Sequence, residues 1–414
     1  MQIILTHPTG SPFVKHAVIA LQERKLLSKV LTSFVYRNSS ALATVLNLLP
    51  KRMGQSMIKE LKRRAWIEDQ RITVDSYETR EIIRMLLEKS CLRALSGLRY
   101  QSLVDWVCVG LDGKAAAQIA SGLQCNAVYC YEDSAAETFL QAKKRKITCF
   151  YDLPIVHYRA AFQIQEEEAE LFPELSSSIQ AIHEPKWKLE RKGQEIELAD
   201  QIIVASSISK NSLLQAGVQA KKIKVVPYGS PVDSFSPGIK KDNVFRALFV
   251  GRVGARKGVH YLLDAWKRLN LKNAELILIG VNELPLNYLK RYDKNIVCIS
   301  SLPHSALSEY YVNSSLLVLP SLVEGFGMVL LEAMASGIPV VASENTAAPD
   351  FVTEGVDGFV LPVRATDLLE ERLLWCFQNQ EQLSKMGQAA RATAEKLSWA
   401  KYEKSLQDVV QTYA

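Results

Sequence analysis

The chain has 414 residues, 48% of them hydrophobic and 23% charged, with a formal net charge of +6. This length exceeds what one hydrophobic core usually serves, so the sequence predicts an ordinary globular protein of about two domains. The modest charge argues against a nucleic-acid-binding protein, and no run approaches the roughly 18 consecutive apolar residues of a membrane-spanning helix.

The seven cysteines form no C-x-x-C pair, and most lie in apolar runs where a thiol packs as a small hydrophobe. An odd count without a zinc pattern predicts reduced thiols and a cytoplasmic protein. The opening segment, "MQIILTHPTG", has too short an apolar run for a signal peptide.

Short apolar runs between longer amphipathic segments predict buried parallel strands. In the first half of the chain these runs are 2–5, 105–110, 127–132, 147–152 and 201–206. One of the intervening helices is predicted over 134–146, with Ser134 as its N-cap.

After a turn-rich break at 228–238, a second series of apolar runs follows at 246–251, 274–280, 295–300, 315–320 and 338–343. Alternating strands and helices in both halves predict two doubly wound, Rossmann-like α/β domains with a junction near 233–244. Open parallel sheets bind ligands at the carboxyl ends of their strands, so the loops that follow the strands are the places to look for a site.

Two loops of the first half hold a candidate glycine and a candidate histidine. Gly10 lies between the first strand and a helix, where it would admit a phosphate closely or simply form a tight turn. His157 lies just past the strand at 147–152. A lone histidine is more often structural than catalytic, but a place at the carboxyl edge, facing the expected cleft between the domains, makes this one a candidate.

In the second half, the loop after the strand at 246–251 carries Arg252 and Lys257, ahead of a helix that opens near Gly258. Two cations beside a helix N-terminus would flank a phosphate-sized space. Two solvated surface cations are the alternative interpretation.

The segment 320–343 places Glu324 and Glu332 around a Gly-x-Gly turn. Without Cβ atoms the backbone can approach a ligand, and a helix that begins near Met328 directs unpaired N–H groups toward it. Glu332 could accept hydrogen bonds from vicinal hydroxyls, and Glu324 from a second polyhydroxyl group. A loop acid and a helix-dipole partner would explain each residue separately, but not their joint placement.

Two charge clusters remain. The run "EEE" at 166–168 predicts a solvated helical face, and no acidic or histidine pair indicates a metal, so we expect neither metal nor cofactor. The segment 51–64 carries six basic residues and one acid. With its apolar stripe and the adjacent Trp66, the segment 51–66 is a candidate for attachment to an anionic membrane at its inner face, or else packs as an ordinary helix.

Taken together, these residues resemble the retaining glycosyltransferases of family 4, the group-one family whose glycosyltransferase-B fold sets two Rossmann-like domains across a cleft. The resemblance is carried by Glu324 and Glu332 with "GFGMVLL" between them, and by the segments 197–210, 224–233, 249–258, 337–343 and 354–363. It departs from the family at Ser11 and Pro12, which follow Gly10, and at Asp350, where many members carry glutamate. No residue identifies the nucleotide base.

The resemblance implies a domain organisation and a set of site residues. Residues 1–235 would bind the acceptor, 236–395 would bind the nucleotide sugar, and 396–414 would form a helix that packs back on the first domain. The implied catalytic residues are His157, Arg252, Lys257 and Glu324. The implied donor-binding residues are Gly10, Arg252, Lys257, Glu324, Gly325, Phe326, Gly327, Met328, Val329 and Glu332.

The implied function is metal-independent transfer of a sugar, with retention, from a nucleotide-diphosphate sugar to a glycan, lipid-linked or small-molecule acceptor. Arg252, Lys257 and helix dipoles would stabilise the departing diphosphate, and no carboxylate nucleophile is evident for double displacement. Another two-domain nucleotide-sugar enzyme, such as an epimerase or glucan synthase, and a non-catalytic nucleotide-sugar-binding scaffold stay open as alternatives. A Rossmann oxidoreductase is disfavoured, since no G-x-G-x-x-G follows an early strand.

Overall fold

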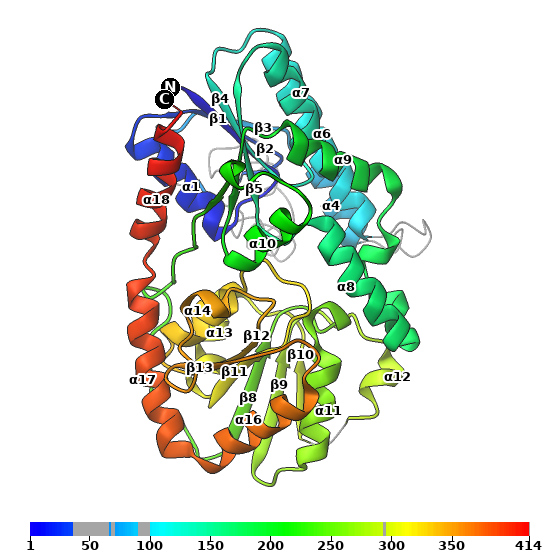
Figure 1. The fold of residues 1–414 in the computed structure, drawn as a ribbon, viewed down its shortest axis with the longest axis vertical. Helices are drawn as coiled ribbons and strands as arrows, with labels where there is room; N and C mark the ends of the chain where they lie inside the picture. The colour runs from blue at the N-terminus through cyan, green and yellow to red at the C-terminus, as the bar shows by residue number, and fades with distance from the viewer. Residues whose placement is uncertain (36–65, 68–70, 90–99, 293–294, 414) are drawn as a thin grey trace, which may run out of the picture. The chain divides into compact units, whose positions relative to one another are not determined.

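The computed structural model describes residues 1–35, 66–67, 71–89, 100–292 and 295–413 (Figure 1). Two parallel sheets organise them, each with helices on its faces. The helices are α1 (Pro12–Glu23), α4 (Glu78–Lys89), α6 (Tyr100–Ala120), α7 (Ala136–Lys144), α8 (Tyr158–Leu171), α9 (Lys186–Leu198), α10 (Ser207–Gln215), α11 (Val259–Leu269), α12 (Leu286–Leu289), α13 (His304–Val312), α14 (Met328–Ala335), α15 (Ala348–Phe351), α16 (Thr366–Gln378), α17 (Gln380–Lys396) and α18 (Trp399–Gln411).

The first sheet has seven strands in the order β3-β2-β1-β4-β5-β6-β7. They are β1 (Ile3–His7), β2 (Leu27–Thr32), β3 (Val74–Ser76), β4 (Ala127–Tyr131), β5 (Thr148–Leu153), β6 (Gln201–Val204) and β7 (Ile223–Val225). Residues of β4 are all at most 2% exposed, as expected for a strand covered on both faces.

The second sheet has six strands in the order β10-β9-β8-β11-β12-β13. They are β8 (Phe245–Val250), β9 (Ala274–Ile279), β10 (Ile296–Ile299), β11 (Leu316–Leu319), β12 (Val340–Ser343) and β13 (Gly358–Leu361). The order along the sheet reverses between the adjacent strands β8 and β11. Such a reversal opens a crevice at the carboxyl ends of the two strands, which is where doubly wound sheets bind ligands.

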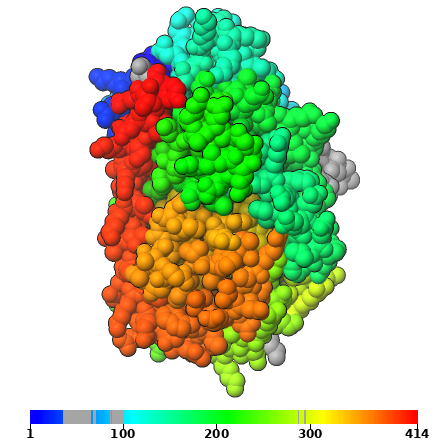
Figure 2. Space-filling model, in the orientation of Figure 1, coloured from blue at the N-terminus to red at the C-terminus, as the bar shows by residue number. Residues whose placement is uncertain are grey.

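The chain forms two compact units by its internal contacts. The first unit holds Met1–Leu153, Lys186–Ile203 and Glu403–Ala414, and the second holds Pro154–Pro185 and Val204–Tyr402. This division differs from a single boundary at 235/236, since 154–185 and 204–235 group with the second unit. Residues that follow β11, orange in Figure 2, form much of the visible surface of that unit.

The last helix ends within the first unit, as expected for a C-terminal helix that returns to the N-terminal domain. The Glu403 carboxylate lies 2.6 Å from Nδ1 of His16 on α1. The Gln407 amide donates to the carbonyl of Ala20 at 3.0 Å, and its oxygen accepts from Arg24 Nε at 3.0 Å. In the described parts of the chain, no helix combines the length and the apolar character needed to span a membrane.

The strand predicted at 105–110 is wrong, because this stretch lies inside α6. The apolar run resembles a buried strand only when it is cut off at Gly110. Over the whole helix, buried apolar side chains recur every three or four residues, which is a helical period; they are Leu103, Val107, Cys108, Leu111, Ala115, Ala116 and Ile119. Trp106, inside the run, is 38% exposed.

The predicted N-cap of α7, Ser134, is also wrong. Its hydroxyl donates to the carbonyl of Tyr131, and the helix begins two residues later. The open N–H groups of Glu137 and Thr138 instead donate to the carboxylate of Asp112, at 2.8 and 2.9 Å. A carboxylate from another helix satisfies this N-terminus, and such a partner cannot be read from local spacing.

The acidic run at 166–168 is not the solvated face that its composition predicts. The side chain of Glu168 is 1% exposed, and its two oxygens lie 2.6 Å from His260 Nε2 and 2.8 Å from Arg364 Nε. Burial alone would raise the pKa of Glu168, but hydrogen bonds from His260 and Arg364 lower it. The buried carboxylate thereby joins α8 to α11 and to the loop after β13.

We expect Glu168→Ala to lower the free energy of unfolding by about 3–5 kcal/mol, because it leaves Arg364 and His260 without their buried partner. Urea denaturation at neutral pH would measure the loss. Because the folded-state pKa of Glu168 is depressed, its contribution is present above the unfolded pKa and lost as the pH falls through the folded one. The variant should therefore lose less stability on acidification than the wild type.

Glu167→Ala is the matched control. Glu167 lies on the same helix and contacts Arg364 at 3.0 Å, but its side chain is 46% exposed. An exposed pair contributes about 0–1 kcal/mol. Equal losses in the two variants would contradict the role assigned to the buried carboxylate.

Candidate functional site

Two helix N-termini with glycine caps lie at the reversal point of the six-stranded sheet. α11 follows β8 and is capped by Gly258 at φ 65°, and α14 follows β11 and is capped by Gly327 at φ 87°. Neither cap offers a side-chain oxygen to the helix, unlike Ser11 of α1 or Ser206 of α10. Among the described hydrogen bonds, none takes the amides of Val259 and His260 or those of Met328 and Val329, and the helix dipoles favour an anion at both places.

The loops that carry these caps are bonded to each other. The carbonyl of Arg256 accepts from the amides of Leu322 and Val323, at 3.0 and 3.3 Å. The guanidinium of Arg256 donates to the carbonyl of Val323 at 2.8 Å. A Cβ on Gly258 would stand 1.9 Å from the carbonyl oxygen of Pro320. Only glycine therefore allows the two loops to meet at this distance.

Two of the predicted catalytic side chains are in contact. Lys257 Nζ forms an ion pair with the Glu324 carboxylate, and the two side chains are 13% and 15% exposed. Burial, followed by repulsion from Arg256, lowers the pKa of Lys257. The contact with Glu324 opposes this shift and favours the charged amine. An anionic ligand at the two helix N-termini would offer Lys257 a second negatively charged partner beside Glu324.

Arg252, the other predicted cation, lies on the same loop and is more open. Its side chain is 43% exposed, and Nη1 donates to Glu283 Oε1 at 2.6 Å. Glu283 follows β9 and also accepts from Gln180 at 3.1 Å. Sequence reasoning missed Glu283, although the loop after 274–280 was an available signal because it too leaves a strand at its carboxyl end.

Glu332 lies in the second turn of α14 and is nearly buried, at 6% exposure. Its Oε1 is 3.0 Å from Nε2 of His304, and its Oε2 accepts from the hydroxyl of Tyr311 at 2.8 Å. Both partners belong to α13, and neither was predicted. The sequence around Tyr311 showed no strand or loop pattern that would have marked it. His304 follows the predicted strand at 295–300, so its position was an available signal.

The Gly-x-Gly turn is positioned by close backbone packing. A Cβ on Gly325 would stand 1.9 Å from the carbonyl oxygen of Pro154 and 2.5 Å from the Cα of Ile155. The carbonyl of Gly325 accepts from the hydroxyl of Ser209 at 3.2 Å and from that of Ser206. Glycine is needed here for protein packing, whatever else the turn binds.

The residues after Gly325 divide into core and backbone roles. The Phe326 ring is 3% exposed and packs 5.0 Å from the ring of Tyr228, so only its backbone can face a ligand. Met328 and Val329 are the first residues of α14, and their amides have no intrahelical acceptor. This placement fits the backbone role that the family resemblance implies for them.

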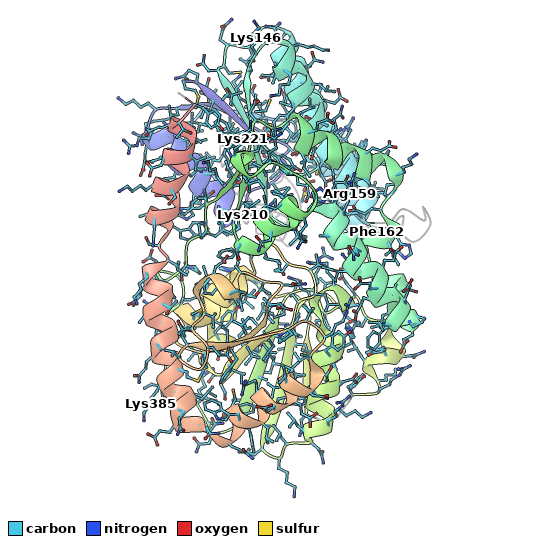
Figure 3. All side chains as sticks on the ribbon, viewed as in Figure 1. Lys146, Arg159, Phe162, Lys210, Lys221 and Lys385 are labelled. Atoms are coloured by element: carbon cyan, nitrogen blue, oxygen red, sulfur yellow. The ribbon has the colours of Figure 1, made fainter. Side chains whose placement is uncertain are left out.

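His157 is the N-cap of α8. Its Nδ1 accepts from the amide of Arg159 at 3.1 Å, and its own amide donates to Ser212 Oγ at 2.8 Å. The ring is 4% exposed and stacks on Tyr158 at 4.5 Å. Figure 3 labels Arg159 and Phe162 in the turns of α8 that follow. Since Nδ1 accepts, the neutral ring carries its proton on Nε2.

Gly10 belongs to the first unit, apart from the other predicted residues. A Cβ on Gly10 would stand 2.0 Å from Cγ of Trp66, so the glycine already has a role in packing against that indole. Trp66 is 8% exposed, and its Nε1 donates to the carbonyl of Phe34 at 3.4 Å. The indole is therefore not free to enter a lipid surface, while residues 51–65 of the predicted membrane segment lie outside the described residues.

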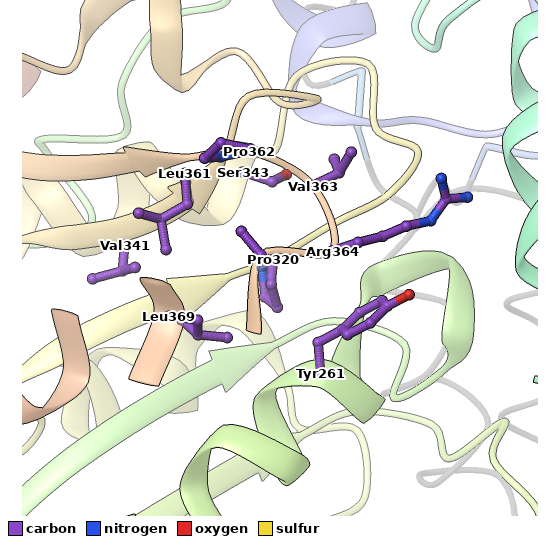
Figure 4. Close-up of a pocket in the computed structure, with 11 residues that line it drawn as sticks. Tyr261, Pro320, Val341, Ser343, Leu361, Pro362, Val363, Arg364 and Leu369 are labelled. Carbon is purple, nitrogen blue, oxygen red and sulfur yellow. The ribbon is translucent and has the colours of Figure 1, made fainter. Parts of the chain in front are cut away.

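A cavity of about 20 Å³ lies beside the start of α11 (Figure 4). Tyr261, Pro320, Ser343 and Arg364 are among its lining residues, and its volume accommodates about one water molecule. None of the predicted donor-binding residues lines it, so it is separate from the predicted site. Within the described ranges, no three histidine, cysteine or acidic side chains gather as a metal site.

We expect Gly258→Ala to destabilise the protein more than Gly355→Ala, and urea denaturation would compare them. Both glycines have a positive φ, 65° and 71°, which costs a residue with a Cβ about 1–2 kcal/mol. A Cβ on Gly355 meets nothing within 4 Å, so this control isolates the backbone strain. The additional loss of unfolding free energy in Gly258→Ala measures the collision with Pro320. Equal losses in the two variants would contradict the close approach of the two loops.

Comparison with known proteins gives three kinds of match. Residues 231–393 match the family described as Glycosyl transferases group 1. The D-inositol 3-phosphate glycosyltransferase of Kribbella flavida is 27% identical over 245 residues, which are 53% of this chain and 58% of that protein. The amylovoran biosynthesis glycosyltransferase AmsD of Erwinia amylovora is 28% identical over 201 residues, covering 47% and 57%. The matched part thus spans somewhat more than half of each relative.

Among solved structures, Anabaena Alr3699/HepE in complex with UDP aligns over 100% of both chains with a TM-score of 0.64 at 17% identity. This alignment supports the predicted fold, an α/β chain with two Rossmann-like domains. The matched family segment contains the loops after β8 and β11 together with Arg252, Lys257, Glu324 and Glu332. The candidate site therefore lies within the segment 231–393, which is similar to the glycosyl transferases group 1 family.

Proposed function

We propose that the chain is a retaining, metal-independent glycosyltransferase. It takes a sugar from a nucleotide-diphosphate sugar and passes it to a glycan, lipid-linked or small-molecule acceptor. One observation carries the proposal: two uncapped helix N-termini converge at the reversal point of one sheet, with Lys257 and Glu324 beside them.

The convergence suits a diphosphate leaving group. Amides at the starts of α11 and α14 supply donors, and Lys257 and Arg252 supply charge, so negative charge that develops on the departing phosphate meets groups already in position. Donor binding would replace the contact of Lys257 with Glu324, which releases the carboxylate to accept from hydroxyls of the sugar. Lys257 and Glu324 would thus each have a polar partner both with and without the donor, so neither charge is left buried and unpaired.

The transfer step follows from this arrangement. The bond between the anomeric carbon and the phosphate oxygen breaks, and the acceptor hydroxyl oxygen forms a bond to the same carbon on the same face. The hydroxyl proton passes to the departing phosphate oxygen. The resemblance to family 4 supports retention, and it implies that His157 lies beside the transferred sugar.

The relatives suggest donor and acceptor classes. The Anabaena structure contains UDP, and the names of the two curated relatives point to an inositol phosphate and to the biosynthesis of a polysaccharide. The donor that we propose for this chain contains a nucleoside diphosphate. A thermal-shift panel with UDP, GDP and ADP would test it, because a ligand that binds only the folded state raises the melting temperature. No shift with any of the three would contradict the proposal.

We expect Lys257→Met to slow transfer about 10²–10³-fold at saturating donor, the cost typical of removing one group that stabilises developing charge. Arg268→Met is the matched control. Arg268 lies in the last turn of α11, the helix that follows Lys257, is 53% exposed and pairs with Asp367, so its loss should leave the rate unchanged. A steady-state assay of nucleotide release would compare them, and equal rates would remove Lys257 from the mechanism.

Substitutions of Glu332 and Glu324 should change different kinetic constants. We expect Glu332→Ala mainly to raise the KM for the donor, about tenfold, since it loses hydrogen bonds to the nucleotide in the ground state and the transition state alike. Glu324→Ala should mainly lower kcat, because the sugar is the part that changes during transfer. Wild-type kcat and KM in both variants would contradict the assignment.

The stereochemical course has its own test. NMR of the product formed from a donor of known anomeric configuration should show that configuration unchanged. Inversion would overturn the retaining mechanism and leave donor binding untouched, so this result is independent of the thermal-shift panel.

A further inference from the structure

We propose that His304 is a positioning residue that holds the Glu332 carboxylate in the orientation that receives the donor's ribose hydroxyls. The inference rests on the proposed function and adds a residue to its donor site. It starts from an electrostatic difficulty: Glu332 is a carboxylate with 8% of its side chain exposed, and an ionised group at such burial needs compensation.

The compensation comes from two side chains of α13, one for each oxygen. His304 Nε2 lies 3.0 Å from Oε1, and the Tyr311 hydroxyl donates to Oε2 at 2.8 Å. Each carboxylate oxygen has two lone-pair sites, so one on each remains for a ligand. The pair of contacts fixes the carboxylate plane while leaving acceptor capacity for two vicinal hydroxyls.

A phenylalanine fixes the orientations of both partners. The edge-to-face contacts of Phe235 place its centroid 5.0 Å from the His304 ring and 5.4 Å from the Tyr311 ring, both at 87°. Phe235 is itself 1% exposed. Arg391 of α17 donates to the carbonyl of Phe235 at 2.9 Å and to that of Ala335, the last residue of α14, at 2.7 Å. The Arg391 guanidinium thus links the backbone of Phe235 to the end of α14, the helix that carries Glu332.

His304 and Tyr311 differ in access to solvent, and this difference points to function. The side chain of His304 is 56% exposed, whereas Tyr311 is fully buried. A group needed only to neutralise a buried acid would be expected on the buried side, as Tyr311 is. His304 instead approaches Glu332 from the open, carboxyl end of β10, the direction from which a ligand at the sheet edge arrives.

The position of His304 makes its charge respond to pH. The hydrogen bond that His304 donates to Glu332 raises the pKa of His304, against a smaller lowering by burial. The groups that face it are the Glu332 carboxylate on α14, the Tyr311 hydroxyl on its own helix and the apolar ring of Phe235. Below the raised pKa the imidazolium holds Glu332 with a charge-assisted bond; above it the bond weakens. Nucleotide affinity should therefore fall as the pH rises through that value.

Three variants of the full chain separate positioning from packing. His304→Phe retains an aromatic ring against Phe235 and loses the bond to Glu332. His304→Gln keeps an N–H donor within reach of the carboxylate but cannot titrate. Tyr311→Phe removes the other donor to Glu332 and leaves His304 in place.

The measurement is the Kd of UDP by titration calorimetry between pH 5.5 and 9, with GDP and ADP used if they bind more tightly. At pH 6 we expect His304→Phe to weaken binding about tenfold, the loss of one charge-assisted bond. His304→Gln should bind within about threefold of the wild type, and both variants should lose the wild-type dependence on pH. Tyr311→Phe should weaken binding but keep that dependence.

Each other outcome counts against a specific claim. Wild-type affinity and pH dependence in His304→Phe would overturn the positioning role while leaving the glycosyltransferase proposal intact. If His304→Phe failed to fold, a wild-type pH dependence in His304→Gln would overturn the role just as well. Failure of the wild type to bind UDP, GDP or ADP at any pH would overturn the proposed function, and the role of His304 with it.

Discussion

The close approach of Gly258 to Pro320 is the constraint on which the candidate site depends. It lets the loops after β8 and β11 share backbone hydrogen bonds through Arg256. Two helix N-termini then converge on one space, although each alone would be an ordinary helix start. A side chain at position 258 would force these loops apart and separate Lys257 from Glu324. Geometry at one glycine thus decides whether the charged residues act together.

Within that geometry, three charged side chains of the candidate site each have a partner of opposite sign. Lys257 is opposed by Glu324, Arg252 by Glu283, and Glu332 by His304. Each pair places opposite charges together, and an anionic or hydroxylated ligand would offer these side chains an alternative partner. The candidate site presents cations and hydrogen-bonded carboxylates at one sheet edge, which are the groups that the proposed nucleotide-sugar donor requires.

The sequence predicted most of the second sheet and the residues at its carboxyl edge. Continuous apolar runs marked β8 to β12, and glycines beside charged residues marked the loops that follow. Short strands such as β3 and β7 were not predicted, since three residues give too little periodicity to detect. Gly110 divided the apolar run of α6 and made part of a helix resemble a strand. Contacts between distant segments were beyond the reach of local patterns: the burial of Glu168 by His260, and the bond of His304 to Glu332.

The contact of Gly325 with Pro154 and Ile155 bears on how chimaeric enzymes should be built from this chain. Exchanging residues 1–235 for those of another glycosyltransferase would replace the segment that packs against the Gly-x-Gly turn. The foreign backbone would then have to match a contact that tolerates no added atom. A graft that leaves Pro154–Pro185 and Val204–Tyr402 in place would keep all segments of the second compact unit together. The Gly-x-Gly turn would then keep the backbone contacts that position it.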